Sequence, residues 1–458
     1  MTTRRHLFAL VASSLLLGAC ATAPQGANQP PIVFVHGNGD SAAIWQSTVW
    51  RFESNGWPSE RLHAIDLPYP LARDDDSKAQ PGRTSTTEHM AYLKAEVEQV
   101  LRATGAQQVV LVANSRGGNA VRNYIQNGGG DATVSHAVLG GTPNHGVWAT
   151  KGLREANEFS GTGPFLTALN APKNAAGDEV TGPVKWMTIR SHNNDKFAQP
   201  DGLWIGAKGT PTNVSFEGPA LKGATNAVLP RVDHRETSFS PAAFDTAYRF
   251  ITGQAPKTLN VTTQAAVVLN GKIVGLGLVP TDPASGNYAN NLPLPGALLA
   301  VYATDPATGE RKGAAVHNTR VATDGLWGPF TAQAGVPYEF VISAPDYATT
   351  HIYRSPFLRS SSLIHLRAER AAAADKDAKS TVTFNRPRGY FDAERDKMVF
   401  DGKTLPGVPA TGAGVSSSKI QLMEDGARAI SAEFNGEKIT GRSWPAAENH
   451  LVILELTN

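Results

Sequence analysis

The chain has 458 residues, a length that predicts two or three domains. Its hydrophobic share of 41% and charged share of 18% are typical of a globular protein. The net charge of +2 gives no field strong enough to imply a nucleic-acid partner, and we expect none. The 44 glycines and 30 prolines indicate many turns and therefore much β-structure.

Residues 1–20 predict a lipoprotein signal peptide. Arg4 and Arg5 precede an apolar run that is too short to span a bilayer, and the run ends in LGAC, which resembles a lipobox. Cys20 is the only cysteine, so we expect it to carry a lipid and no disulfide to form. An ordinary signal peptide with an incidental cysteine is the alternative.

The lipobox predicts an exported protein that is anchored in a membrane through Cys20 or, without the lipid, secreted. Ala21 follows the cysteine in place of aspartate, and by resemblance to Gram-negative lipoproteins this favours the outer membrane. Residues 21–30, ATAPQGANQP, predict a flexible tether.

Residues 31–255 predict an α/β domain. Short apolar runs expected to be strands (PIVFV, RLHAIDL, VVLVA, VSHAVLGG and VKWMTIRS) alternate with segments of helical spacing. Helices are expected at 87–105, which Gly105 ends, and at 241–253. This alternation predicts a mostly parallel, doubly wound sheet that helices cover on both faces.

The character of the sequence changes near residue 256. Strand-like runs now recur about every ten residues, with turn signals such as Asn270-Gly271 and Asp324-Gly325 between them. Residues 256–370 therefore predict an all-β sandwich domain. Residues 371–458 predict a charged, alanine-rich linker followed by a second, smaller β-unit.

The stretch VVLVANSRGGNAVRNYI, residues 109–125, predicts a strand that stops at a serine and continues as a helix. A serine held on such a sharp turn needs small residues two positions before and after it, and these are Ala113 and Gly117. Ser115 is therefore a candidate nucleophile. An ordinary strand-to-helix turn that contains a serine is the alternative.

Acyl transfer by serine also needs donors that stabilise an oxyanion. The first predicted strand ends in His36-Gly37-Asn38-Gly39, where glycine lets the backbone N–H of Asn38 turn toward a pocket. The backbone N–H of Arg116, at the start of a helix, is the second candidate donor. A simple glycine turn is the alternative interpretation of HGNG.

The acid and the histidine of a triad should follow the serine in that order. Asp195 lies just after the strand-like VKWMTIRS, and Asp201 in the same loop is the alternative acid. His234 lies between that loop and the closing helix, where the order predicts the base. Three other histidines fit the order less well, because they precede the acid or lie too near it: His136, His145 and His192.

Together the segments VHGNG, ANSRGG, GGTPNHG, RSHNNDKFAQP and VDHRE resemble bacterial lipases of the α/β-hydrolase superfamily, especially the small class 2 lipases. The resemblance implies a nucleophile, acid and base at Ser115, Asp195 and His234. Ala113 departs from the usual elbow glycine, and Arg116 stands where such lipases often have methionine or glutamine. The Arg116 guanidinium is expected at the pocket rim, binding an anionic substrate group, or else in solvent.

These features predict a serine carboxylic-ester hydrolase that acts on hydrophobic acyl esters through an acyl-enzyme, with a lipid or small-molecule ester as its substrate. Residues 151–180 are expected to cover the pocket with apolar side chains, including those of Leu153, Phe159, Leu166 and Leu169. The chemistry requires no metal or cofactor, and none is expected. The alternatives are an extracellular polyester depolymerase and an inactive surface-binding lipoprotein.

Overall fold

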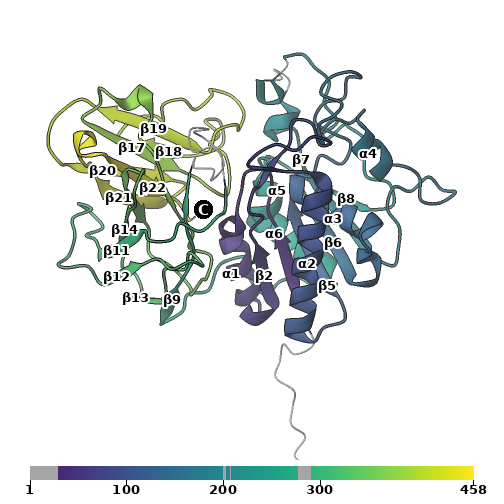
Figure 1. Cartoon of the computed structure of the whole chain (residues 1–458), viewed down its shortest axis with the longest axis horizontal. Coiled ribbons are helices and arrows are strands. Elements are labelled where there is room, and N and C mark those ends of the chain that lie inside the picture. The colour runs from purple at the N-terminus through teal and green to yellow at the C-terminus, as the bar shows by residue number, and fades with distance from the viewer. Residues whose placement is uncertain (1–28, 200–202, 207, 277–289, 458) are drawn as a thin grey trace, which may run out of the picture.

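The computed structural model describes residues 29–199, 203–206, 208–276 and 290–457. Its two halves lie side by side, an α/β half from the N-terminal part of the chain and a β-rich half from the C-terminal part (Figure 1). The predicted signal peptide with Cys20, the tether up to residue 28 and Asp201 lie outside the described residues.

A six-stranded parallel sheet forms the centre of the α/β half, in the order β2-β1-β5-β6-β7-β8. Its strands are β1 (Ile32–Val35), β2 (Leu62–Ile65), β5 (Val109–Asn114), β6 (Val134–Gly140), β7 (Lys185–Ser191) and β8 (Thr225–Leu229). The short strands β3 (Leu71–Ala72) and β4 (Arg83–Thr84) pair separately. Because all six strands are parallel, the loops that follow them meet at one edge of the sheet.

Helices pack on both faces of this sheet. Val33 and Val35 of β1 join the core beneath α2 (Thr86–Thr104) and α3 (Arg116–Asn127). Ile32 and Phe34 face the other way, into the core beneath three further helices, α1 (Gln46–Ser54), α5 (Glu236–Phe239) and α6 (Pro241–Thr252). The predicted doubly wound α/β class is therefore confirmed. α4 (Pro164–Leu169) lies outside these two layers (Figure 1).

The predicted helix at 87–105 is α2, and local signals set both its ends. The Ser85 side chain accepts from the backbone N–H of Glu88, whose carboxylate accepts from the Ser85 N–H. Gly105 ends the helix with φ 65°, a conformation that glycine adopts without strain. Within the described ranges, no helix is long and apolar enough to cross a bilayer.

The β-rich half is built on a seven-stranded sheet in the order β12-β11-β14-β15-β22-β17-β19. Its strands are β11 (Leu298–Ala303), β12 (His317–Arg320), β14 (Tyr338–Ser343), β15 (Thr349–Arg354), β17 (Ser380–Asn385), β19 (Ser417–Leu422) and β22 (His450–Glu455). Smaller sheets pair β9 (Val267–Leu269) with β13 (Phe330–Ala332), β10 (Ile273–Gly275) with β16 (Leu366–Ala368), and β18 (Met398–Phe400) with β20 (Ala429–Phe434) and β21 (Glu437–Arg442). The predicted C-terminal β-structure is confirmed.

The predicted boundary at residue 371 does not separate two sheets. The last strand, β22, lies between β15 and β17 and pairs in parallel with both. The two predicted β-units thus share one sheet while keeping separate cores, one around Trp327 and Phe340 and the other around Phe384 and Phe434. Parallel pairing of such distant segments leaves no local signal in the sequence, which explains the difference.

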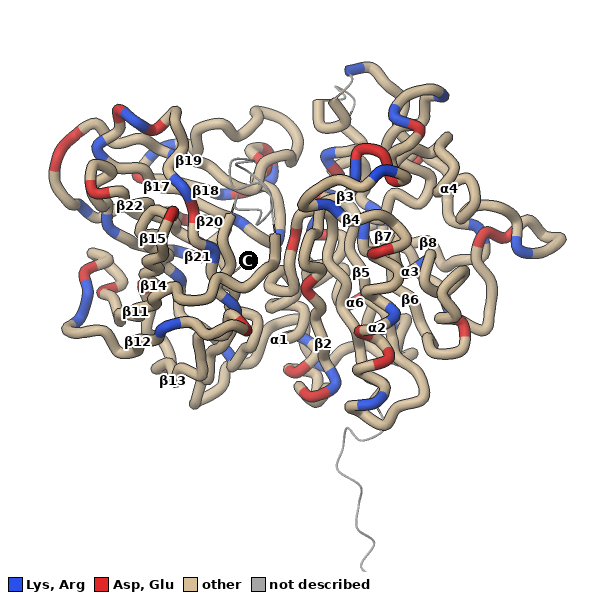
Figure 2. The backbone as a smooth tube through the Cα atoms, in the orientation of Figure 1, with Lys and Arg blue, Asp and Glu red and all other residues tan. Residues whose placement is uncertain are grey.

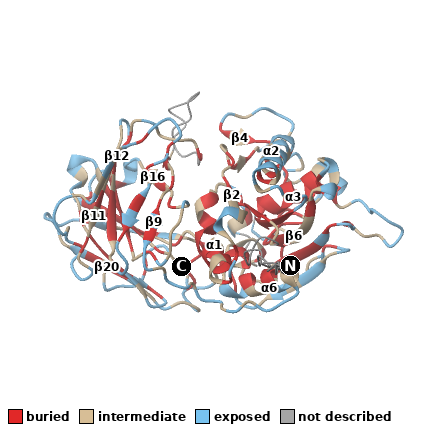
Figure 3. Ribbon diagram, turned by 90° about the horizontal axis from the view of Figure 1, so that it is seen from below, coloured by how far each residue is buried: buried red, intermediate tan, exposed pale blue. Residues whose placement is uncertain are grey.

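Buried residues fill the interior of each half (Figure 3), and residues of both charges are interspersed over the whole molecule (Figure 2). The halves contact each other through polar groups and through Trp50, whose side chain joins the apolar core of the β-rich half. Asp66, just after β2, accepts from Lys272 Nζ and His365 Nε2 of the β-rich half, each at 2.8 Å. Trp50 of α1 donates its indole N–H to the Ser360 carbonyl at 2.8 Å. These contacts hold the β-rich half against α1 and the loop that follows β2.

The Asp66 contacts predict a pH-dependent interface. Burial alone would raise the pKa of Asp66, but the charges of His365 and Lys272 outweigh it and hold that pKa below its ordinary value. A depressed carboxyl pKa contributes stability above the unfolded-state value of about 4, and this contribution is lost as the pH falls below it. We expect Asp66→Asn to lower the free energy of unfolding by about 2 kcal/mol at pH 7.

Urea unfolding at pH 7, 5 and 3 measures this effect. The difference between the wild type and Asp66→Asn should shrink as the pH falls from 5 to 3. The exposed Asp131 serves as the control, and Asp131→Asn should leave the unfolding curve unchanged at every pH. A difference for Asp66→Asn that stays constant with pH would contradict the assignment.

Candidate active site

Ser115 lies at the sharp turn between β5 and α3, at the edge where the parallel strands end. Its φ of 52° and ψ of −123° are strained for a side-chain-bearing residue. Its backbone N–H donates to the Gly140 carbonyl of β6 at 2.8 Å, and the residue is 8% exposed. The structure therefore places Ser115 in the strained strand-to-helix turn that its sequence context predicts.

Gly117 lets this turn approach the end of β1. A Cβ at residue 117 would lie 2.6 Å from the Val35 carbonyl oxygen and 2.7 Å from that of His36, closer than real Cβ contacts. Gly37 also lies close to the turn, since a Cβ at that position would be 3.1 Å from the Ser115 Cβ. Ala113 is buried in the sheet core, so its methyl group packs without disturbing the turn.

The loop that carries Asn38 is held in one conformation by its neighbours. The buried His36 ring lies with Nδ1 2.9 Å from the Gly37 carbonyl and accepts the Leu67 N–H at Nε2, at 3.1 Å. Burial lowers the pKa of His36, which favours its neutral form. Asn38 Oδ1 accepts from the Ala72 N–H at 2.7 Å. Arg116 begins α3, so its backbone N–H is among those that lack an acceptor within the helix.

The structure brings Asp195 and His234 together. Asp195 Oδ2 lies 2.6 Å from His234 Nδ1, and both residues are buried. The other carboxylate oxygen accepts from the Phe197 N–H at 2.9 Å, which fixes the carboxylate, and the Phe197 ring meets the His234 ring edge-on at 4.8 Å. Both side chains lie on loops at the sheet edge. A carboxylate at Nδ1 holds the imidazole with Nε2 free for a second partner.

His234 lies beside the Ser115 turn, although no hydrogen bond joins the two side chains among the described residues. The Asn114 amide, next to Ser115, donates to the His234 carbonyl at 3.4 Å and to Ser238 Oγ at 2.9 Å. The three other histidines have different partners. His145 contacts Glu179 at 2.8 Å, His192 stacks on Phe216 and His136 meets Phe250.

The side chain of Arg116 lies neither at a pocket rim nor in solvent, so both predictions for it are wrong. It is fully buried. Its Nε and Nη2 donate to the Glu158 carboxylate at 2.8 to 3.0 Å, and its Nη1 donates to the Pro70 carbonyl at 2.9 Å. Burial raises the pKa of Glu158 despite this partner. Arg116 therefore ties the turn that carries Ser115 to two surrounding loops.

We expect Arg116→Met to lower the free energy of unfolding by about 3–5 kcal/mol, because it leaves the Glu158 carboxylate buried without its cation. The double variant Arg116→Met/Glu158→Leu should recover most of this loss, since neither charge then remains. Chemical denaturation of the single and double variants measures the loss of stability and its recovery. A single variant within about 1 kcal/mol of the wild type would contradict a buried ion pair.

The apolar residues of the segment predicted to cover the pocket lie in two separate places. Leu166 and Leu169 of α4 are fully buried and serve packing. Leu153 and Phe159 instead join a small apolar cluster with Trp148, Ile205 and Val214, which also includes Ala198 and Phe197 of the Asp195 loop. Among the described residues, no group of three or more His, Cys, Asp or Glu side chains could hold a metal ion.

Residues of the β-rich half reach the loop of His234, and sequence reasoning missed them. Arg386 contacts Asp233 at 3.1 Å and Glu236 at 2.5 Å, on either side of His234. Arg395 also pairs with Glu236, and the Tyr390 N–H donates to Asp233 at 2.7 Å. The stretch NRPRGYFDAERDK supplies these groups. It is rich in charged residues, but no pattern in it indicates which distant residues they contact.

Two segments of the chain match known protein families. Residues 29–177 match the family described as Lipase (class 2), and residues 265–371 match the Lipase C-terminal domain. The first match contains the Asn38 loop and Ser115 and ends before Asp195 and His234.

Among solved structures, Aspergillus fumigatus lipase B is 16% identical, with 52% of this chain and 56% of that chain covered and a TM-score of 0.36. The mature form of Bacillus licheniformis lipase BlEst2 is 21% identical, with 49% and 92% covered and a TM-score of 0.35. Its propeptide form is 15% identical, with 92% and 94% covered and a TM-score of 0.35. The chain thus contains a segment that matches the class 2 lipases, on a parallel α/β sheet, followed by a segment that matches the lipase C-terminal domain.

Proposed function

We propose that the chain is a serine carboxylic-ester hydrolase whose triad is Ser115, Asp195 and His234. The lipase family matches support hydrolysis of esters. The observation that carries the proposed triad is the 2.6 Å contact between Asp195 Oδ2 and His234 Nδ1, beside the strained turn of Ser115. These residues also follow one another in the order that the superfamily uses.

In the proposed reaction, Ser115 Oγ attacks the carbonyl carbon of the ester, and His234 Nε2 takes the serine proton. Asp195 orients the imidazole and stabilises its charged form. The backbone N–H groups of Asn38 and Arg116 stabilise the oxyanion. The intermediate collapses when His234 gives its proton to the leaving alcohol. Water, deprotonated by His234, then attacks the acyl-enzyme and releases the acid.

Hydrophobic acyl esters are the proposed substrates. The apolar cluster of Trp148, Phe159, Ile205 and Val214 includes Phe197 and Ala198 of the loop that carries Asp195. Apolar side chains so near the proposed triad favour acyl chains over small polar esters. The test is hydrolysis of p-nitrophenyl esters from C2 to C16 by residues 21–458. Turnover with a preference for acyl chains longer than acetate is expected, and absence of turnover with every ester would refute the proposal.

We further propose export of the protein and lipid attachment at Cys20. The lipobox-like LGAC at the end of the apolar run and the lack of any other cysteine support this. Metabolic labelling of the full chain with a palmitate analogue, followed by membrane fractionation, tests it. The Cys20→Ala protein should carry no label and should be absent from the membrane fraction. A labelled or membrane-bound Cys20→Ala protein would contradict the proposal.

A further inference from the structure

The turn that carries His234 is closed by the two carboxylates on either side of it. Asp233 Oδ1 accepts from the backbone N–H groups of Arg235 and Glu236, each at 2.9 Å. Glu236 Oε2 accepts in return from the Asp233 N–H at 2.8 Å, the reciprocal pattern of a capping box. The Thr237 hydroxyl also donates to the His234 carbonyl at 2.7 Å. The backbone of His234 therefore lies in a turn whose shape depends on Asp233 and Glu236.

A single arginine of the β-rich half bridges these two carboxylates. Arg386 Nη1 donates to Asp233 Oδ2 at 3.1 Å, and Arg386 Nη2 donates to Glu236 Oε1 at 2.5 Å. Burial and the nearby charge of Asp233 raise the pKa of Glu236, because two carboxylates held close together repel each other. A planar guanidinium reaches both carboxylates at once and so offsets a repulsion that would otherwise open the turn.

The side chain of Arg386 is buried and confined by its neighbours. Its guanidinium carbon lies 4.3 Å from the centre of the Phe434 ring, a cation–π contact. On the chain itself, a Cβ at residue 389 would lie 2.3 Å from Arg386 Cζ, so a side chain in place of Gly389 would displace the guanidinium. These neighbours leave the guanidinium little freedom, and it therefore holds the two carboxylates in a fixed geometry.

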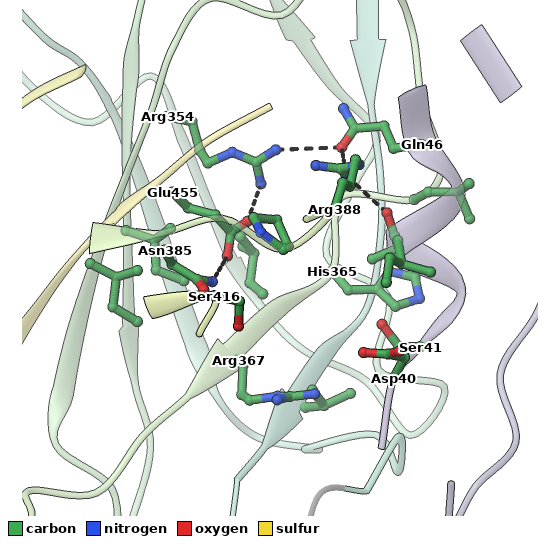
Figure 4. Close-up of a pocket in the computed structure, with 18 of the residues that line it drawn as sticks. Asp40, Ser41, Gln46, Arg354, His365, Arg367, Asn385, Arg388, Ser416 and Glu455 are labelled. Atoms are coloured by element: carbon green, nitrogen blue, oxygen red, sulfur yellow. Dashed lines mark hydrogen bonds and ion pairs between the residues drawn. The ribbon is translucent and has the colours of Figure 1, made fainter. Parts of the chain in front are cut away.

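The residues next to Arg386 face a different space. They line a polar cavity of about 230 Å³ between the two halves: Asn385, Pro387 and Arg388. Figure 4 shows Arg388 beside Gln46 of α1, to which it donates at 2.7 Å. Arg386 lies outside this lining and reaches the His234 turn instead. Arg386 therefore links the halves at the turn of the proposed base, beside a space that separates them.

Tyr390, in the same segment as Arg386, contacts the loops of both the proposed acid and the proposed base. Lys196 Nζ lies 4.5 Å from the centre of the Tyr390 ring, and the Arg235 guanidinium carbon lies 5.1 Å from it. Lys196 directly follows Asp195, and Arg235 directly follows His234. The β-rich half is therefore in contact with both loops that set the 2.6 Å contact between acid and base.

We propose that Arg386 is a positioning residue of the proposed triad. By bridging the carboxylates on either side of His234, it holds the imidazole where it meets Asp195. This inference rests on the proposed function. A displacement of about 1 Å in a catalytic group costs about 100-fold in rate. Because Arg386 acts through the turn of His234, its loss lowers kcat and leaves KM unchanged.

Steady-state kinetics of residues 21–458 with p-nitrophenyl butyrate test this role. Arg386→Gln removes the bridge and should lower kcat about 100-fold, with KM within about twofold of the wild type. Arg386→Lys keeps the charge but cannot reach both carboxylates at once, so it should lower kcat about tenfold. The lysine variant leaves no buried carboxylate without a cation nearby, and it carries the test if Arg386→Gln does not fold.

Arg359→Gln is the matched control. Arg359 of the β-rich half pairs with Glu53, near the C-terminal end of α1, at 3.0 Å. The change therefore removes an arginine that links the same two halves but does not contact the His234 turn. Arg359→Gln should keep kcat within about twofold of the wild type.

A spectroscopic readout needs no turnover. The proton between His234 Nδ1 and Asp195 Oδ2 lies in a short hydrogen bond and should give a far-downfield proton NMR signal. The absence of this signal from His234→Ala assigns it. The signal should shift or disappear in folded Arg386→Lys and stay unchanged in Arg359→Gln, since only the first change displaces the imidazole.

Three results would overturn the proposal. Folded Arg386 variants could keep both kcat and the imidazole signal of the wild type, which would leave Arg386 no part in placing His234. Arg359→Gln could lower kcat as much as Arg386→Lys, which would assign the effect to docking of the halves as a whole. KM could rise while kcat stays constant, which would indicate contact with the substrate. A wild type that hydrolyses no ester would instead refute the proposed function, and the imidazole signal would still test the role of Arg386.

Discussion

Ser115→Ala will lower kcat for p-nitrophenyl butyrate by at least about 10⁴-fold, because in the proposed mechanism Ser115 Oγ forms the acyl-enzyme. The stability of the folded state should not change, because the Ser115 side chain is small. The turn is held instead by the backbone hydrogen bond that the Ser115 N–H donates to the Gly140 carbonyl. Steady-state kinetics and thermal unfolding of the same preparation measure both effects.

Ser59→Ala is the matched control for this result. Ser59 lies in a short 3-10 helix before β2, away from the sheet edge that carries Ser115, and its hydroxyl is exposed. The control should keep full activity. If Ser115→Ala retains more than about a hundredth of wild-type kcat while Ser59→Ala is normal, the nucleophile is another group and the proposed mechanism is wrong.

Asp195→Asn will lower kcat by about 10⁴-fold with little change in KM. The amide has nearly the shape of the carboxylate, but it presents an N–H or a neutral oxygen to His234 Nδ1, which lies 2.6 Å from the present Oδ2. The imidazole then loses the acceptor that fixes its tautomer and the charge that stabilises its protonated form. Kinetics with p-nitrophenyl butyrate over a range of pH measure the loss.

Asp201→Asn is the variant to compare with Asp195→Asn, because Asp201 is the alternative acid in the same loop. It should leave kcat within about twofold of the wild type, because the acid that contacts His234 is Asp195. The reverse pattern, with Asp201→Asn inactive and Asp195→Asn active, would assign the acid to Asp201.

Features set by local sequence could be predicted. The parallel sheet follows from apolar strands that alternate with amphipathic helices, and Ser85, Glu88 and Gly105 mark both ends of α2. The turn at Ser115 is predictable because close packing against β1 requires glycine at residue 117. The candidate base could be selected because the fold fixes the order of nucleophile, acid and histidine along the chain.

Features set by distant contacts could not be predicted. The side chain of Arg116 was expected near the surface, because an arginine is rarely buried unless a partner compensates its charge. That partner, Glu158, comes from another loop, and no local pattern links the two. The insertion of β22 between β15 and β17, and the contacts of Arg386 beside His234, likewise depend on how the two halves pack.

The central claim is that Ser115 is an activated nucleophile. The most direct test is treatment of residues 21–458 with a fluorophosphonate, followed by peptide mapping by mass spectrometry. The proposed triad predicts one phosphonyl group per chain, on Ser115, and no labelling in His234→Ala, which lacks the base that activates the serine. No modification of Ser115, or equal modification with and without His234, would contradict the proposed mechanism.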